Sequence, residues 1–149
     1  MSGRNSFAAL ASVCLVASLA DAGAQEAPAI KAPPKGYPAL PLLSTGSTIL
    51  GEPIHYPSGQ AQVTAAIVTM APGARTIEHK HGVPMFAYIL EGEITVDYGD
   101  KGKRTYRAGD ALMEAMDVAH FGENTGTTPM RLIAVYMGAK GASDVIPVR

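Results

Sequence analysis

The chain contains no tryptophan and few aromatic residues, with six tyrosines and three phenylalanines among 149 residues. Its single cysteine, Cys14, lies inside an apolar N-terminal run. If this run is cleaved off, the mature protein has neither a disulfide nor a thiol nucleophile. Its stability must then come from a packed core, from a metal or from association with another chain.

The sequence also has no large excess of charge of either sign, because its 12 basic residues nearly balance its 13 acidic ones. The densest basic group is Lys101, Lys103, Arg104 and Arg107, which falls on a polar turn and the strand predicted after it. Such a group is typical of a solvated sheet edge, so we expect no nucleic-acid partner.

Several catalytic signatures are absent from the sequence. It has no glycine-rich phosphate loop, no zinc-finger spacing, no serine nucleophile motif and no pair of carboxylates at a diagnostic spacing. It also has no internal repeat and no predicted helix of useful length. At this length, a single domain with a sizeable core is expected.

Residues 1–24 have the pattern of a secretory signal peptide. Arg4 supplies a positive start, residues 7–20 are apolar, and the small residues 22–24 resemble a cleavage site. The apolar run is shorter than the about 20 residues that span a bilayer. We therefore expect cleavage before Gln25, a periplasmic or secreted protein, and no membrane attachment after cleavage. An uncleaved anchor is the alternative.

Residues 25–46 are predicted to form an extended arm or linker, because they contain Pro28, Pro33, Pro34, Pro38 and Pro41. Proline cannot donate to a sheet ladder and so disfavours a central strand. The apolar stretch 37–43 is expected to pack on the domain or on a partner subunit.

The region 47–138 is predicted to be all-β, since short β-branched and aromatic runs alternate there with turn signals. The expected strands cover residues 48–55, 62–70, 76–79, 85–90, 93–98, 104–106, 111–114, 119–123 and 130–137. The clearest hairpin turns through residues 99–102. The polar tail, residues 139–149, is expected to be loosely ordered.

Three of the four histidines have the arrangement of metal ligands. His79 and His81 are two residues apart, so on an extended strand their imidazoles project from the same face. His120 follows another strand signal and can reach that face from elsewhere in the sheet. These three residues are the predicted ligands of one metal ion per chain. His55 is interpreted as a surface residue, with an approach to the pocket as the alternative.

The residues around these histidines resemble the two sequence motifs of the cupin superfamily. The first motif is matched by Gly73, His79, His81 and Gly92. The second is matched by Gly109, His120 and Asn124, while Ala115 and Asp117 stand where the family has proline and glycine. The resemblance covers residues 49–137. It implies a single antiparallel barrel, or jelly roll, with a metal near its centre, and by analogy a homodimer. It does not by itself imply an activity.

One position departs from the family pattern, because Met85 occupies the place of the family's glutamate ligand. Its thioether is either a soft ligand, which would favour copper, or an apolar filler. Glu114 is the better candidate for a substitute carboxylate. Glu78 is expected to face the other side of its strand, while Glu91 and Glu93 are expected to be solvated. The methionines near the motifs are Met70, Met85, Met113, Met116, Met130 and Met137.

Export affects which metal is expected at the site, because an exported protein takes up its metal outside the cytoplasm. There the relative affinities of a nitrogen site favour copper or zinc, with iron and manganese as alternatives. The favoured function is an exported metal-binding protein that sequesters, senses or holds a small ligand. The alternative is a dioxygenase-like, metal-dependent oxygenase acting on a small anionic or enolisable substrate. Its acid–base candidates would be Glu114, Tyr88 and Tyr106.

Overall fold

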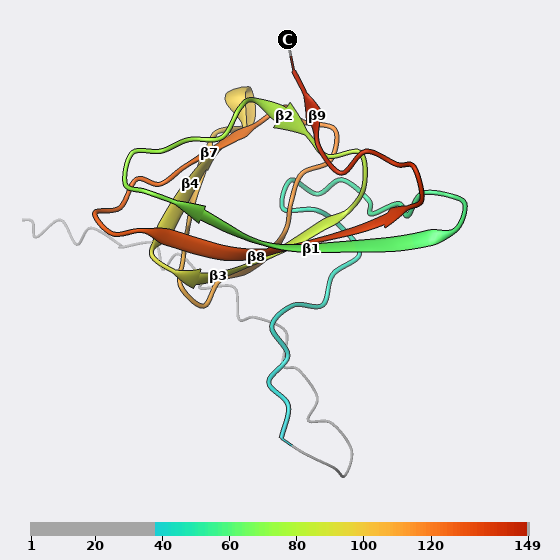
Figure 1. The fold of residues 1–149 in the computed structure, drawn as a ribbon, viewed down its shortest axis with the longest axis horizontal. Coiled ribbons are helices and arrows are strands. Elements are labelled where there is room, and N and C mark those ends of the chain that lie inside the picture. The colour runs from blue at the N-terminus through green and yellow to red at the C-terminus, as the bar shows by residue number, and fades with distance from the viewer. Residues whose placement is uncertain (1–37, 149) are drawn as a thin grey trace, which may run out of the picture. The chain divides into compact units, whose positions relative to one another are not determined.

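The computed structural model describes residues 38–148, shown in colour in Figure 1. The expected signal peptide and most of the proline-rich arm lie outside the described residues, so their boundaries remain predictions. The described part is all-β apart from one short 3₁₀ turn, η1 (Gly99–Lys101). Within residues 38–148, no helix has the length and apolar character needed to span a membrane.

The strands form antiparallel sheets. The four-stranded sheet has the order β1-β8-β3-β6, with β1 (Ala61–Met70), β8 (Met130–Ala139), β3 (Met85–Glu91) and β6 (Ala111–Met113). The three-stranded sheet has the order β5-β4-β7, with β5 (Lys103–Arg107), β4 (Glu93–Asp97) and β7 (Phe121–Glu123). A third pair joins β2 (His79–Lys80) to β9 (Ile146–Pro147).

The hydrophobic core draws side chains from both the four-stranded and the three-stranded sheet, whose strands Figure 1 shows. On β3 burial alternates, so that Met85, Ala87 and Ile89 face inward. Ile94 and Val96 do the same from β4. This alternation follows from the period of two along a strand, which places every second side chain on the core face. The two sheets therefore share one core, which also surrounds the site described below.

Gly92 forms the connection between the two sheets, because it separates β3 from β4. Its φ of +70° lies in the region that other residues rarely adopt. A Cβ at this position would lie 2.7 Å from the carbonyl oxygen of Pro129. Both facts require glycine at this position of the first motif.

Most of the predicted strands are confirmed within one or two residues at each end, but two predictions are wrong. Residues 48–55 are not a strand, because residues 48–52 turn, with the Thr48 hydroxyl donating to Glu52 and the Gly51 amide donating to the Thr48 carbonyl. These local bonds compete with a sheet ladder. The segment 76–79 is not a strand either, since β2 begins only at His79.

The tail after β8 was expected to be loosely ordered, and this expectation is wrong. Residues of β9 pair with β2, with His79 opposite Pro147 and Lys80 opposite Ile146. Gly82 lies beside this tail, and an added Cβ there would collide with the carbonyl oxygen of Ser143. Pairing with a distant strand is a tertiary effect that the polar composition of the tail does not reveal.

Candidate metal centre

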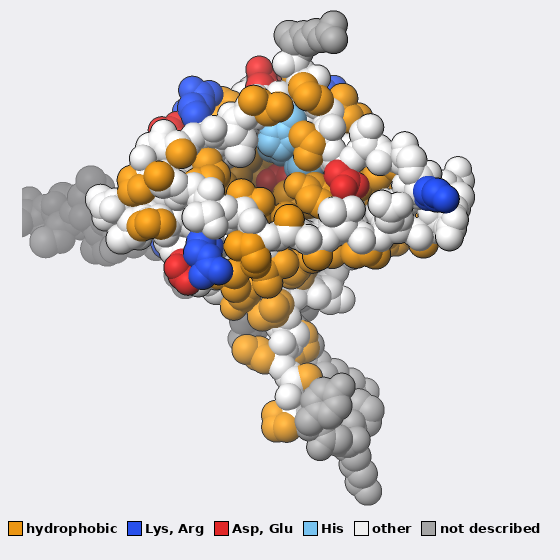
Figure 2. Space-filling model, viewed as in Figure 1, with side chains coloured by type: hydrophobic (Ala, Val, Ile, Leu, Met, Phe, Trp, Pro, Cys, Tyr) orange, Lys and Arg blue, Asp and Glu red, His pale blue; other side chains and the backbone are white. Residues whose placement is uncertain are grey.

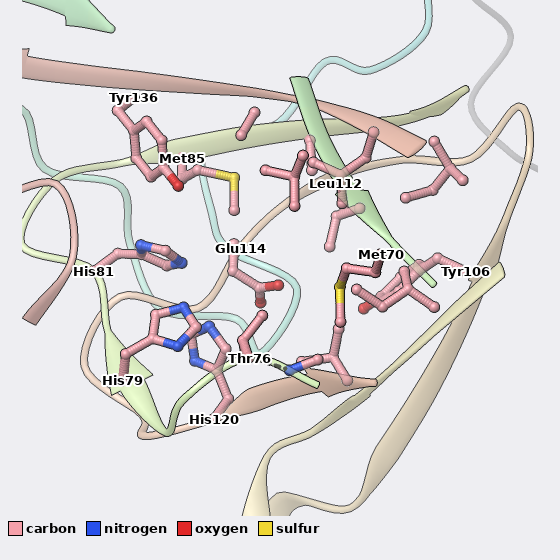
Figure 3. A pocket seen from close by; sticks show the side chains of 18 residues that line it. Met70, Thr76, His79, His81, Met85, Tyr106, Leu112, Glu114, His120 and Tyr136 are labelled. Atoms are coloured by element: carbon pink, nitrogen blue, oxygen red, sulfur yellow. Dashed lines mark hydrogen bonds between the residues drawn. The ribbon is translucent and has the colours of Figure 1, made fainter. Parts of the chain in front are cut away.

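The three histidines come together through backbone pairing. His79 and His120 face each other in an antiparallel bridge, and each amide donates to the other's carbonyl at 2.9 Å. Directly opposite residues share a face. His81 directly follows β2, and its ring lies on the same side, 4.9 Å from that of His79. Figure 3 shows the three imidazoles side by side. The same-face arrangement predicted from the spacing is confirmed, while ligation of a metal stays a prediction.

The imidazoles are close enough to serve one ion. Their ring centroids are 4.7 Å apart for His79 and His120, 4.9 Å for His79 and His81, and 5.1 Å for His81 and His120. One ring nitrogen from each lies within 4.8 Å of the others. Nitrogens that share an ion at about 2.1 Å can be at most about 4.2 Å apart. Small side-chain rotations would therefore bring the three into a common coordination sphere.

Each imidazole is oriented by a backbone carbonyl. The Nδ1 atom of His79 donates to Ile77 at 2.8 Å, and that of His120 donates to Val118 at 2.8 Å. The Nδ1 atom of His81 donates to the carbonyl of Asp144, in the C-terminal tail, at 3.1 Å. A carbonyl oxygen can only accept a hydrogen bond, so the proton must be on Nδ1 in all three rings.

This tautomer leaves the Nε2 lone pairs available. The Nε2 atoms of His81 and His120 are buried and have no hydrogen-bond partner among the described residues. Both side chains belong to residues that are only 2% exposed, whereas His79 is partly exposed. A buried polar atom without a partner is costly, and metal-binding histidines commonly donate their other nitrogen to a carbonyl. The geometry therefore fits a metal site.

Burial also keeps the imidazoles neutral, which is the form that binds metals. Loss of hydration lowers the pKa of His81 to about 4, against the opposing effect of the Asp144 carbonyl. Loss of hydration likewise lowers the pKa of His79, and the Ile77 carbonyl opposes it. Neither ring needs to lose a proton at neutral pH before it can act as a ligand.

The imidazoles open into a cavity of about 90 Å³ between the two sheets. Its lining combines the histidines, Glu114 and Thr76 with aliphatic side chains such as Ile89 and Leu132. Figure 2 shows histidine side chains at the floor of a hollow bordered mainly by hydrophobic side chains. At about 30 Å³ per water molecule, this volume suits only a small ligand.

Glu114 supplies a carboxylate to this cavity. The residue is 5% exposed, and its Oε1 atom accepts hydrogen bonds from the Tyr98 hydroxyl at 2.7 Å and the Ala115 amide at 2.8 Å. The Tyr98 hydroxyl also lies 3.2 Å from that of Tyr106. Burial, helped by the Glu114 charge, raises the pKa of Tyr98, and burial raises that of Tyr106 to about 12. Both phenols therefore stay protonated.

Tyr98 was missed by the sequence analysis as a member of the site. The signal was present, because Ile94, Val96 and Tyr98 alternate and all three are buried. Tyr136, which lines the cavity beside His81 at a ring separation of 5.7 Å, was also missed. Its inward position on β8 could not be distinguished from that of an ordinary core residue.

Among the acid–base candidates, Tyr106 and Glu114 line the cavity, whereas Tyr88 does not. Tyr88 alternates with Ala87 and Ile89 on β3, which face the cavity, so its side chain is on the other face. The prediction for Tyr88 is therefore wrong.

The remaining carboxylates and the fourth histidine lie at the surface, as predicted. Glu91 pairs with Arg131 at 2.8 Å and Glu93 pairs with Arg107 at 3.3 Å, while Glu78 and His55 are exposed. None of them lines the cavity.

Two methionines, Met70 and Met85, line the cavity among the described residues. Met85 packs within the core cluster, and its carbonyl accepts the Glu114 amide at 2.9 Å. The soft-ligand and filler interpretations of Met85 both remain predictions. The other motif methionines do not contribute to a sulfur-rich pocket.

Asn124, the last residue of the second motif, is structural. It is fully buried, and its Nδ2 atom donates to the carbonyls of Met70 and Thr128 at 2.9 Å each. Its Oδ1 atom accepts the Gly126 amide at 3.0 Å. The side chain thus fastens the end of β1 to the loop after β7.

Residues 66–136 match the family model of the cupin domain. The chain therefore carries a cupin domain, and the predicted family is confirmed. A comparison with the curated proteins gave no significant match.

Solved structures with a similar fold include large cupin enzymes. Oxalate decarboxylase from Lactobacillus farciminis in complex with formate is 24% identical, with a TM-score of 0.50, over 60% of this chain and 27% of that chain. Oxalate oxidase in complex with the substrate analogue glycolate is 23% identical, with a TM-score of 0.49, over 58% of this chain and 46% of that chain.

A further similar structure is the polyketide cyclase RemF from Streptomyces resistomycificus. It is 20% identical, with a TM-score of 0.48, over 62% of this chain and 63% of that chain. The chain spans about a quarter of the length of the oxalate decarboxylases that it matches. At these identities the comparison concerns the fold alone.

Proposed function

We propose that this protein binds one metal ion per chain through the Nε2 atoms of His79, His81 and His120, with space beside the ion for a small ligand. The observation that carries the proposal is the state of the imidazoles. All three Nδ1 atoms are held by backbone carbonyls, and two Nε2 atoms are buried without a partner.

Three neutral nitrogen donors favour copper or zinc, with iron and manganese as alternatives. A bound ion would supply a Lewis acid that attracts and polarises an oxygen of a ligand in the cavity. The chain's own residues would orient the ligands and shape the cavity around the ion. The carbonyls fix the direction of the imidazoles, the aliphatic wall excludes water, and Tyr98 holds the Glu114 carboxylate in place.

The direct test is a titration of metal-free protein with Zn²⁺ and with Cu⁺ by calorimetry or a competing chelator. We expect one ion per chain in the natural protein, no comparable binding in the triple variant His79→Ala/His81→Ala/His120→Ala, and unchanged binding in the matched control His55→Ala. His55 is exposed and outside the cluster. Circular dichroism would confirm that the triple variant folds, and equal affinity of a folded triple variant would refute the site.

A second candidate function is a metal-dependent oxygenase acting on a small anionic or enolisable substrate. It is favoured by the buried Glu114 carboxylate, which shares the cavity with the imidazoles and is placed to act as a base. Oxygen consumption by the metal-loaded protein with a panel of small enolisable acids would support it. Tight metal retention without oxygen consumption would favour the binding protein.

Export to the periplasm or the medium belongs to the same proposal and is supported by the signal-like residues 1–24. Sequencing the N-terminus of protein recovered outside the cytoplasm should give Gln25. The finer description of the fold as a single cupin barrel, or jelly roll, is likewise proposed, on the support of two sheets that share one core.

A further inference from the structure

The carboxylate that the first cupin motif lacks is supplied from the neighbouring strand. The pairs Phe86–Met113 and Ala87–Leu112 join β3 to β6, and the next position brings Glu114 opposite Met85. The Glu114 amide donates to the Met85 carbonyl at 2.9 Å, which continues the ladder. Opposite residues share a face, so the Glu114 side chain enters the cavity beside the place where the family has its glutamate.

Glu114 stands apart from the group of atoms suited to hold the ion. Among the described residues that group consists of the three histidines, and the Glu114 carboxylate is not a member. Figure 3 shows the carboxylate between the imidazoles and the end of the cavity near Leu112. Glu114 is therefore placed to touch a ligand that lies beside the ion.

The carboxylate has one oxygen left for such a contact. Oε1 already accepts the Tyr98 hydroxyl and the Ala115 amide. Oε2 makes no hydrogen bond within residues 38–148, and it is not among the fully buried polar atoms that lack a partner. It therefore faces the open space of the cavity, where an ionised carboxylate can only accept a hydrogen bond.

The charge of the lining restricts what can be accepted. No lysine or arginine lines the cavity among the described residues, so the negative charge of Glu114 has no cationic side chain beside it there. A divalent ion would balance the charge of Glu114 and of one anionic group on a ligand. A second anionic group would stay uncompensated in a place of low dielectric, which is unfavourable. A ligand with a hydroxyl group would instead donate to Oε2.

We propose that Glu114 makes this cavity selective for small molecules that combine a metal-binding oxygen, a hydroxyl group and a short hydrocarbon part and that carry no more than one negative charge, and that it rejects dicarboxylates. The hydroxyl donates to Oε2 of Glu114, and the hydrocarbon part lies against aliphatic side chains of the lining, among them Ile89, Leu112 and Leu132. The inference rests on the proposed metal site and specifies the ligand class of that site.

The experiment compares two probes of similar size on the zinc-loaded protein by calorimetry. Acetohydroxamic acid carries a hydroxyl and no more than one negative charge when it binds a metal, whereas oxalate is a dianion. The natural protein should bind acetohydroxamic acid more tightly. Glu114→Gln should weaken its binding by about tenfold, the effect of one charge-assisted hydrogen bond, and strengthen oxalate binding by a similar factor.

Two further variants sharpen the result. Glu114→Asp keeps the charge and should continue to reject oxalate, and it serves if Glu114→Gln does not fold. Glu93→Gln changes a surface carboxylate paired with Arg107 and should alter neither affinity.

The zinc content of each sample separates the two ways of failing. If zinc stays bound and Glu114→Gln shifts both probes equally or neither, the selectivity proposal is overturned and the metal site stands. If the natural protein holds no zinc or other ion, both proposals are overturned.

Discussion

At the scale of single residues, the histidine cluster depends on three carbonyl groups. For His79 and His120 the carbonyl belongs to the residue two positions earlier, Ile77 or Val118. These two contacts are local and have the same sequence separation. The carbonyl that orients His81 comes instead from Asp144, 63 residues away. The spacing of the histidines predicted their shared face, but it could not predict a contact with the tail.

The buried tyrosines give the first prediction, which concerns stability at high pH. The pKa of Tyr106 is raised to about 12, first by burial, and that of Tyr98 is raised as well. An unfolded tyrosine loses its proton near pH 10. Between pH 10 and 12 the unfolded chain therefore binds fewer protons, and the free energy of unfolding should fall as the pH rises, by up to about 2 kcal/mol for Tyr106.

Urea unfolding at pH 8 to 11 would measure this loss. Tyr106→Phe should lose less stability over this range, because its titrating group is gone while the Tyr98–Glu114 bond is kept. An identical pH dependence in the natural protein and in Tyr106→Phe would show that Tyr106 ionises normally.

At the scale of elements, the alternation of apolar residues predicted the strands that build the two sheets. It succeeded where one face of a strand is buried, as in β3 and β4. It failed where polar side chains and distant pairing decide the structure. The Thr48–Glu52 turn depends on a side-chain hydrogen bond, and β9 depends on pairing with β2.

The tail gives the second prediction, because Gly82 allows it to approach the site. Gly82→Ala should push the Ser143 carbonyl away, disturb the Asp144 contact to His81 and lower the free energy of unfolding by about 1–3 kcal/mol. Metal affinity should fall about 10-fold or more, as is typical when an orienting partner is lost.

Urea unfolding and a zinc titration would measure the two effects of Gly82→Ala. Gly46→Ala is the control, because no atom lies within 4 Å of a Cβ added there. If Gly82→Ala behaves like Gly46→Ala in both measurements, the tail does not support the site.

At the scale of the whole described domain, the outer face of the four-stranded sheet is apolar. Val63 and Ile67 on β1 are 65% and 52% exposed. On the same face, Ile67 is followed across the sheet by Ile133 and Tyr88. Among the strands of residues 38–148, β1 is also an edge strand, with β8 as its one partner. An exposed apolar edge strand is a template for pairing with another chain, and two copies related by a twofold axis would match each other.

The third prediction is therefore a homodimer formed through this face. The sequence analysis expected a homodimer by analogy with the family, but it did not assign the face. Light scattering after gel filtration should give the mass of two chains for the mature protein and of one chain for Ile67→Lys. Ile77→Lys is the matched control, because Ile77 is 62% exposed but lies outside this sheet, and it should remain a dimer. A natural protein that is monomeric at micromolar concentration would contradict the prediction.

The central claim is that His79, His81 and His120 hold a metal ion in the natively exported protein. The most direct measurement is elemental mass spectrometry of protein recovered after native export, beside the variant in which all three histidines are replaced by alanine. We predict about one equivalent of a single metal per natural chain, with copper or zinc favoured, and none in the variant. Absence of bound metal from the natural protein, or an equal content in both proteins, would contradict the claim.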